Sequence, residues 1–277
     1  MSSPNSRGSR IAISVVVVLI GLITVLPFYF MAITSLKDMD AYLAEKLLPP
    51  WRPTFSNYIE IFTQLKLAEY FRNSVVVLVA TLVPYVLICS AAGFAFAKLK
   101  FPLRIPLLLL VTAIMIFPQM VLGVQIYNLQ ARIGLLNTHV GLVFAYLGYF
   151  APYAAYLMTT YFRNIPQTFL EAARIDGASL WDIYTRIMLP VARSMLVTVT
   201  IVGSQAVWNE LPFSLLLLRS SEKRTLMAAI ALLNGEYGVP AMEMCAALTV
   251  VALPIILLYV VAQRQIQHGI LAGGIKE

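Results

Sequence analysis

Six stretches of about 20 apolar residues recur along this chain, and they constrain the fold more than any other feature. Backbone amides cannot stay unpaired in hydrocarbon, so each stretch favours a membrane-spanning helix. Only 12% of the residues are charged, against roughly a quarter in soluble proteins. The sequence therefore predicts an all-α integral membrane protein with six transmembrane helices, at Ile11–Ile33, Ser74–Ala97, Leu103–Leu122, Val140–Thr160, Val191–Leu211 and Met242–Ala262.

No polar block long enough for a soluble domain separates these spans, so residues 1–277 are expected to form a single transmembrane domain. Arg7 and Arg10 precede the first span as they would precede a signal peptide. Its apolar run is longer than the roughly 7–15 residues of a signal sequence, so we expect this helix to be retained.

The short loop KLKFPLR carries three positive charges within residues 98–104. Short cytoplasmic loops are enriched in Lys and Arg. We therefore expect a multi-pass membrane protein with a cytoplasmic N-terminus at 1–10, a cytoplasmic loop at 161–190 and a cytoplasmic tail at 263–277. The segments Thr34–Asn73 and Pro212–Ala241 then lie on the external side.

The formal charge of +7 comes from scattered Lys and Arg residues that suit helix ends at lipid headgroups, and it does not indicate nucleic-acid binding. Cys89 and Cys245 lie in apolar segments without His or acidic neighbours at metal-ligand spacing. His139 and His268 are far apart and belong to no known metal motif. The sequence indicates neither a metal nor a catalytic site.

The polar stretch EAARIDGASLWDIYTRIMLP, residues 171–190, interrupts the apolar pattern after the fourth span. Asn164 and Pro166 suit the start of a short helix, and Gly177 suits its end. Ser179 with Asp182 is a capping pattern for a second helix. From local physics alone, this hairpin could lie on the membrane surface or dock another protein.

At its specified positions the same stretch fits the EAA-x3-G-x9-I-x-LP signature, and so resembles the permease subunits of bacterial ABC importers. Similar stretches, such as AFAKLKFPLR, GLLNTHVGL, IPQTFLEAARIDGAS, WNELPFSLLLL and QRQIQHGILAGGIKE, point to the MalG-like carbohydrate branch. The resemblance implies the type I, MetI-like importer fold and a subunit of an ATP-driven, binding-protein-dependent sugar importer in the bacterial plasma membrane.

In that family the hairpin is the coupling helix, which docks into a separate cytoplasmic ATPase. The residues that the resemblance assigns to this contact or place beside it are Glu171, Ala172, Ala173, Arg174, Asp176, Gly177, Ile187, Leu189 and Pro190. The implied partners are a second permease, two ATPase subunits and an extracytoplasmic solute-binding protein. The chain has no G-x-x-x-x-G-K-[ST] loop, so we expect the ATPase to bind ATP and Mg²⁺, and this chain to be a non-enzymatic subunit without a cofactor of its own.

Uncharged sugars are recognised by hydroxyl-bonding groups and flat apolar surfaces, and polar or aromatic residues of the spans can supply both. The candidates for a substrate path are Gln119, Tyr149, Tyr153, Gln205, Asn209 and Glu210. For the tyrosines, helix packing and interfacial anchoring remain an alternative.

Apart from Arg104 and Arg193, which lie close to the ends of two spans, the spans contain no Lys or Arg, and this disfavours a strongly anionic substrate. An importer of the same architecture for a polyol phosphate or another small solute stays open as the second hypothesis. A secondary transporter is a remote one, because no internal repeat or charged intramembrane relay is evident. The sequence does not distinguish one sugar from another.

Overall fold

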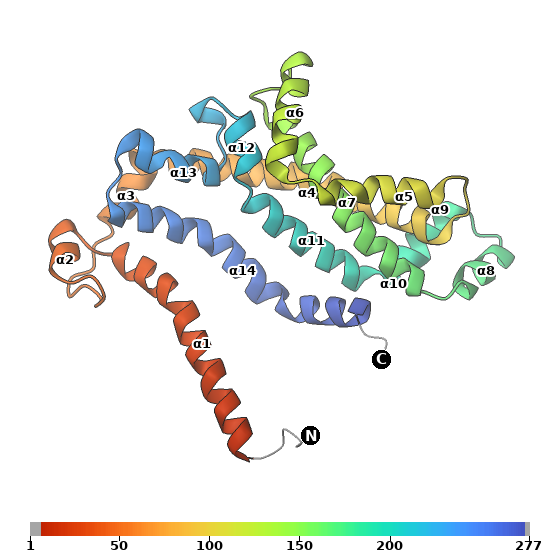
Figure 1. Cartoon of the computed structure of the whole chain (residues 1–277), viewed down its shortest axis with the longest axis horizontal. Coiled ribbons are helices and arrows are strands. Elements are labelled where there is room, and N and C mark those ends of the chain that lie inside the picture. Colours follow the sequence, from red (N-terminus) through yellow and green to blue (C-terminus); the bar gives the residue numbers. More distant parts are fainter. Residues whose placement is uncertain (1–6, 275–277) are drawn as a thin grey trace. The chain divides into compact units, whose positions relative to one another are not determined.

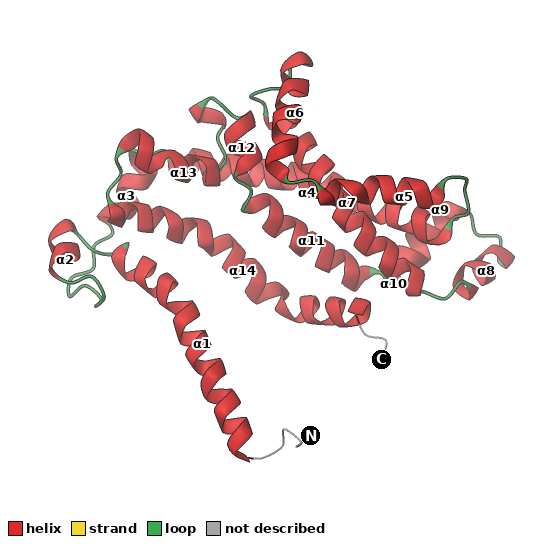
Figure 2. Ribbon diagram, in the orientation of Figure 1, coloured by secondary structure: helices red, strands yellow, loops and turns green. Residues whose placement is uncertain are grey.

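The computed structural model describes the backbone of residues 7–274, together with the side chains of that range except residues 7–10, 12, 234, 236, 237 and 264–274. Within this range the chain forms helices and loops without strands, as Figure 2 shows. The elements are α1 (Arg7–Thr34), α2 (Met39–Ala44), α3 (Ser56–Thr63), α4 (Leu67–Lys98), α5 (Arg104–Ala113), η1 (Ile114–Ile116), α6 (Gln119–Arg132), α7 (His139–Asn164), α8 (Thr168–Ile175), α9 (Leu180–Asp182), the π-helix η2 (Ile183–Met188), α10 (Leu189–Val191), α11 (Arg193–Trp208), α12 (Pro212–Leu217), η3 (Ser221–Lys223), α13 (Leu226–Tyr237) and α14 (Ala241–Gly274).

The all-α membrane fold predicted from the sequence is confirmed. Four helices, α1, α4, α7 and α14, are long and apolar enough to cross a membrane, and two bent pairs bring the number to six when each pair forms one span. The N-terminal residues 1–6 and the last three residues of the expected tail, 275–277, lie outside the described part of the chain.

The third predicted span, Leu103–Leu122, is not a continuous helix. The chain bends by 105° between the α5–η1 segment and α6. Phe117 adopts an extended conformation (φ −83°, ψ 129°), because the ring of the following Pro118 disfavours a helical conformation there. The predicted fifth span, Val191–Leu211, also differs from a single continuous helix. The chain bends by 76° between the segment that ends with α10 and the following α11, and α11 ends at Trp208.

The chain divides into two compact units, of which the first comprises residues 1–67 and 230–253. Within it, part of the predicted external segment is ordered around a buried lysine. The Nζ of Lys37 donates hydrogen bonds to the carbonyl oxygens of Glu45 (2.7 Å) and Lys46 (3.0 Å). The Nδ2 of Asn57 donates to the carbonyl oxygens of Ser35 and Lys37. These hydrogen bonds hold together the loop that connects α1 to α3.

The second unit comprises residues 68–229 and 254–277 and carries both candidate sites. Its central helix is α7, which packs against α5, α11 and α12 (Figure 1). Helix α4 approaches α7 closely at Gly93, where an added Cβ would lie 2.4 Å from the Cβ of Met158. Because no side chain fits in that gap, glycine at this position lets the two backbones pack together.

Candidate functional site

The polar stretch after α7 folds into two short helices that turn at Gly177. Helix α8 ends in a Schellman motif, in which the N–H of Gly177 donates to the carbonyl of Arg174 (3.1 Å) and that of Ala178 donates to Ala173 (2.9 Å). Gly177 has φ +80°, a conformation that strains residues with a Cβ. The predicted turn at Gly177 is confirmed, although α8 begins at Thr168, later than Asn164 and Pro166 suggested.

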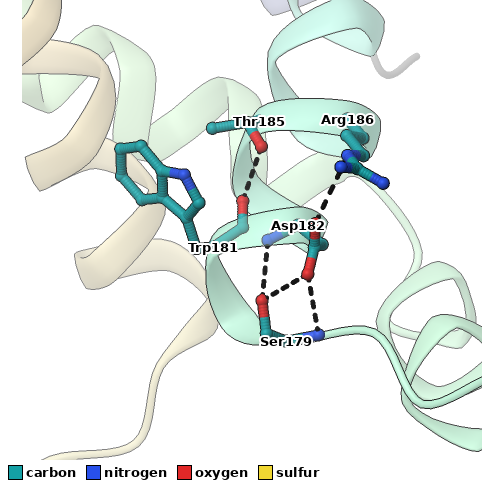
Figure 3. A network of polar contacts seen from close by, with 5 residues as sticks. All are labelled: Ser179, Trp181, Asp182, Thr185 and Arg186. Carbon is teal, nitrogen blue, oxygen red and sulfur yellow. Dashed lines mark hydrogen bonds and ion pairs between the residues drawn. The ribbon is translucent and has the colours of Figure 1, made fainter.

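The second half of the hairpin begins with the predicted capping box (Figure 3). The N–H of Asp182 donates to the Ser179 hydroxyl (3.1 Å), and the N–H of Ser179 donates to the Asp182 carboxylate (3.3 Å). Arg186 pairs with the same carboxylate at 3.3 Å. The hydrogen bond from the Ser179 hydroxyl lowers the pKa of Asp182, and the charge of Arg186 acts in the same direction.

One face of the hairpin is buried in the core of its own chain. Leu170, Ile183 and Met188 are fully buried and belong to the same apolar cluster as Met158 and Phe162 of α7. Further members of that cluster on the hairpin are Ala173 and Tyr184. The hairpin is therefore packed onto the helices that precede it.

Two polar contacts tie the hairpin region to α4. The hydroxyls of Ser90 and Tyr184 share a 2.8 Å hydrogen bond, and the Tyr184 ring lies 5.3 Å from that of Phe94. The Nζ of the buried Lys98 donates a short hydrogen bond to the carbonyl of Ile165, where the chain leaves α7. A displacement of the hairpin would therefore act on the ends of α4 and α7.

The opposite face of the hairpin is exposed. Of the residues assigned to ATPase coupling by resemblance, Ala173 is buried and Ile187 and Leu189 are half-buried, whereas the exposed ones are Glu171, Ala172, Arg174, Asp176, Gly177 and Pro190. Two large apolar side chains project beside them: Ile175 is 87% exposed and Trp181 is 70% exposed. This combination of apolar and charged groups is typical of a protein interface.

Glu210, a candidate for the substrate path, lies in a buried polar cluster instead of at an aqueous boundary. The residue is only 5% exposed. Its Oε1 accepts from the Nε2 of Gln119 and the N–H of Phe213, both at 2.6 Å. Its Oε2 accepts from the hydroxyl of Tyr146 (2.6 Å) and the N–H of Ser214 (3.0 Å). Four donors satisfy this carboxylate, which joins α6, α7 and α12 at one point.

The remaining path candidates fall into two groups. Tyr149 and Tyr153 line a cavity of about 210 Å³ between α4, η1, α7 and α11. Gln205 and Asn209 are exposed on α11 and at its end, and the Nδ2 of Asn209 donates to the carbonyl of Gln205 (3.0 Å). The structure thus brings Gln119 together with Glu210, and Tyr149 together with Tyr153.

Sequence reasoning missed Tyr146, the hydrogen-bond partner of Glu210, and Ser90 and Tyr184, which connect the hairpin to α4. In the sequence, Tyr146 is visible only as a tyrosine within an apolar span. Such a residue does not reveal which distant residue its hydroxyl will contact. Within the described residues, no group of three or more His, Cys, Asp or Glu side chains could hold a metal ion.

Three comparisons with known proteins bear on this site. Residues 85–271 match the family described as binding-protein-dependent transport system inner membrane component. The inner membrane ABC transporter permease protein YcjP of Escherichia coli is 30% identical, over 97% of both chains. The trehalose/maltose transport system permease protein MalG of Thermococcus litoralis is 28% identical, over 96% of this chain and 97% of that one.

A solved structure has a similar fold. The chain superposes with a TM-score of 0.81, at 23% identity, on a crystal structure of a bacterial ABC transporter involved in the import of the acidic polysaccharide alginate, covering 95% of this chain and 99% of that one. At this identity the similarity supports the fold alone.

Proposed function

Because this chain belongs to the family of binding-protein-dependent transport system inner membrane components, we propose that it is the permease subunit of an ATP-driven sugar importer. The chain would form the translocation path together with a second, homologous permease. Two cytoplasmic ATPase subunits would bind ATP and Mg²⁺, and an extracytoplasmic solute-binding protein would deliver the substrate.

The hairpin within residues 161–190 is the proposed ATPase-docking element, and its two unlike faces carry this assignment. The inner face is buried against α4 and α7, while Ile175 and Trp181 project from the outer face. An apolar surface of this kind costs free energy in water and is stabilised when a partner covers it. Glu171 and Arg174 beside it offer charges for orientation, as they are exposed.

ATP binding would close the ATPase dimer and displace the hairpins of both permeases. In this chain the displacement would reach α4 through the Ser90–Tyr184 hydrogen bond and α7 through the shared apolar core. Packed helices switch between discrete arrangements and do not deform continuously, so the expected result is alternating access.

Sugar is the proposed substrate class. The Thermococcus litoralis relative is a trehalose/maltose permease protein by its name. The cavity that holds Tyr149 and Tyr153 is lined by aromatic and apolar side chains without a charged one. An anionic substrate such as a polyol phosphate would find no cationic partner there, so the sugar hypothesis is favoured over that alternative.

Copurification tests the docking assignment. The tagged chain is expected to retain an ATPase subunit after membrane solubilisation, and Ile175→Asp is expected to abolish this retention. Leu103→Asp is the matched control, because Leu103 is also exposed (68%) in the loop between α4 and α5, and its φ of 61° suits Asp. Equal retention by Ile175→Asp and the control would contradict docking through this face.

A further inference from the structure

A cavity of about 210 Å³ lies in the second unit, among four helical segments. Its walls come from Tyr85 of α4, Met115 of η1, Tyr149 and Tyr153 of α7, and Val202 of α11. Drug-sized ligands occupy pockets of roughly 300–1,000 Å³, so this cavity is sized for one small ring.

The cavity combines aromatic surfaces with unpaired phenol groups. Its lining has no charged side chain. Among the described residues, the hydroxyls of Tyr85, Tyr149 and Tyr153 have no hydrogen-bond partner. A phenol hydroxyl can donate one hydrogen bond and accept others, and it is usually paired when buried. Tyr85 is only 2% exposed and lines the cavity, so a hydroxylated ligand inside the cavity would lie against this residue.

Contacts behind the cavity hold two of these rings in place. The Tyr85 ring lies against Gly203, where an added Cβ would be 2.5 Å from its Cε1, so the absence of a side chain at position 203 makes room for the ring. The Tyr149 ring meets Phe150 and Phe213 edge-on, at centroid distances of 5.3 and 5.6 Å. The backbone of Phe213 is itself anchored by Glu210. Rings fixed before a ligand arrives lose little entropy on binding it.

Tyr153 lines the cavity and is 43% exposed. A pyranose ring has one face of C–H groups and an edge of hydroxyls, and the cavity supplies a counterpart to each. Aromatic surfaces can pack on the C–H face, and the phenol groups can bond the hydroxyl edge.

We propose that this cavity is a subsite of this subunit for a single uncharged sugar ring, held by Tyr85, Tyr149 and Tyr153. The proposal rests on the proposed import function and adds the residues of this chain that contact the cargo. Glu210 is not one of them, because both of its carboxylate oxygens are already used by donors of the protein.

Cysteine protection tests the subsite in the assembled transporter. Ala206 also lines the cavity, so Ala206→Cys places a thiol in it. The complex is reconstituted in nanodiscs and treated with a water-soluble thiosulfonate reagent, alone or with glucose, maltose or trehalose. We expect the sugar that the complex transports to slow the modification of the introduced thiol, whereas glycerol 3-phosphate does not.

Three hydroxyl deletions in the Ala206→Cys background make the test specific. Tyr149→Phe and Tyr153→Phe are expected to raise the sugar concentration for half protection by about three- to tenfold, the equivalent of one lost hydrogen bond. Tyr156→Phe is the matched control on α7, since Tyr156 is similarly exposed (46%) to Tyr153 and does not line this cavity.

Uptake measured in parallel separates the two proposals. If the complex imports a sugar that never protects the introduced thiol, the subsite proposal is overturned while the import function stands. Protection that is equal in all three tyrosine variants would also overturn the subsite. If the complex imports no sugar with ATP from a wider panel of mono-, di- and oligosaccharides, the import function itself fails, and the subsite with it.

Discussion

Tyr146 of α7 donates a 2.6 Å hydrogen bond to Oε2 of Glu210, which lies just after α11, and both residues are buried. The two residues are separated by 64 positions in the chain. This contact belongs to a cluster in which Glu210 also binds Gln119 and the start of α12. The cluster fixes the broken third span to the segment after the fifth.

Glu210→Gln should destabilise the chain by about 1–3 kcal/mol, because the new amide places a donor among groups that all donate to this position. Thermal unfolding in detergent measures the effect. Asn209→Ala is the neighbouring control: Asn209 is exposed and bonds only the backbone of the preceding helix, so its loss should cost about 0.5 kcal/mol at most. Similar unfolding temperatures for the two variants would show that the cluster contributes little.

Substitutions at Gly177 should act through backbone strain. No atom lies within 4 Å of a Cβ built at this residue, but its φ is +80°. Gly177→Ala should therefore cost about 1–2 kcal/mol, and Gly177→Asn less, since Asn tolerates this region. We expect the ratio of sugar imported to ATP hydrolysed to fall in the order Gly, Asn, Ala, Val.

Gly148→Ala is the control for Gly177, because it also has no neighbour within 4 Å and lacks a positive φ. It should leave the transport ratio unchanged. The transport ratio could instead fall with increasing side-chain volume at position 177, with Asn no better tolerated than Ala. That result would show that contact with a partner, and not backbone strain, determines which residues are tolerated at this position.

The capping box should make the hairpin sensitive to acid. The pKa of Asp182 is lowered in the folded state, mainly by the Ser179 hydroxyl. The ionised Asp182 carboxylate therefore stabilises the folded hairpin fully above the ordinary pKa of Asp, about 3.9. This stabilisation is lost as the pH falls through the lowered pKa. Amide hydrogen exchange in residues 180–188, corrected for its intrinsic pH dependence, should accelerate in that acidic range. Asp182→Asn should abolish this pH dependence; an unchanged profile in that variant would assign the effect to another group.

Thiol labelling tests the expected orientation of the chain. Trp51 is fully exposed in the loop after α2, and Lys100 is exposed in the loop after α4. In spheroplasts, a membrane-impermeant maleimide should modify Trp51→Cys, whereas Lys100→Cys should react only after lysis. The unmodified chain is the control for Cys89, which is buried, and Cys245, which is half-buried. The reverse pattern would place both termini outside.

Local patterns were sufficient to predict most of the spans, the turn at Gly177 and the Ser179–Asp182 capping box, because each depends on residues within a few positions of one another. The bend at Phe117 also had a local cause in Pro118, but a proline can kink a helix or break it, and packing decides which.

The contacts between distant residues could not be predicted in this way. Tyr85 meets Gly203, and Tyr146 meets Glu210, only because α4, α7 and α11 adopt particular depths and rotations. Apolar spans are almost uniformly hydrophobic, so their sequences specify these rotations weakly. For this reason the sequence indicated Tyr149 and Tyr153 as candidates but did not indicate Tyr85 of α4, which lines the same cavity.

Uptake by proteoliposomes tests most directly the claim that this chain imports sugar through the ATP cycle of another subunit. Liposomes containing the chain with its copurified permease and ATPase, supplied with ATP and the solute-binding protein, should accumulate a radiolabelled sugar. Liposomes without ATP, or with the chain alone, should not. Robust accumulation by the chain alone would contradict its role as an importer subunit.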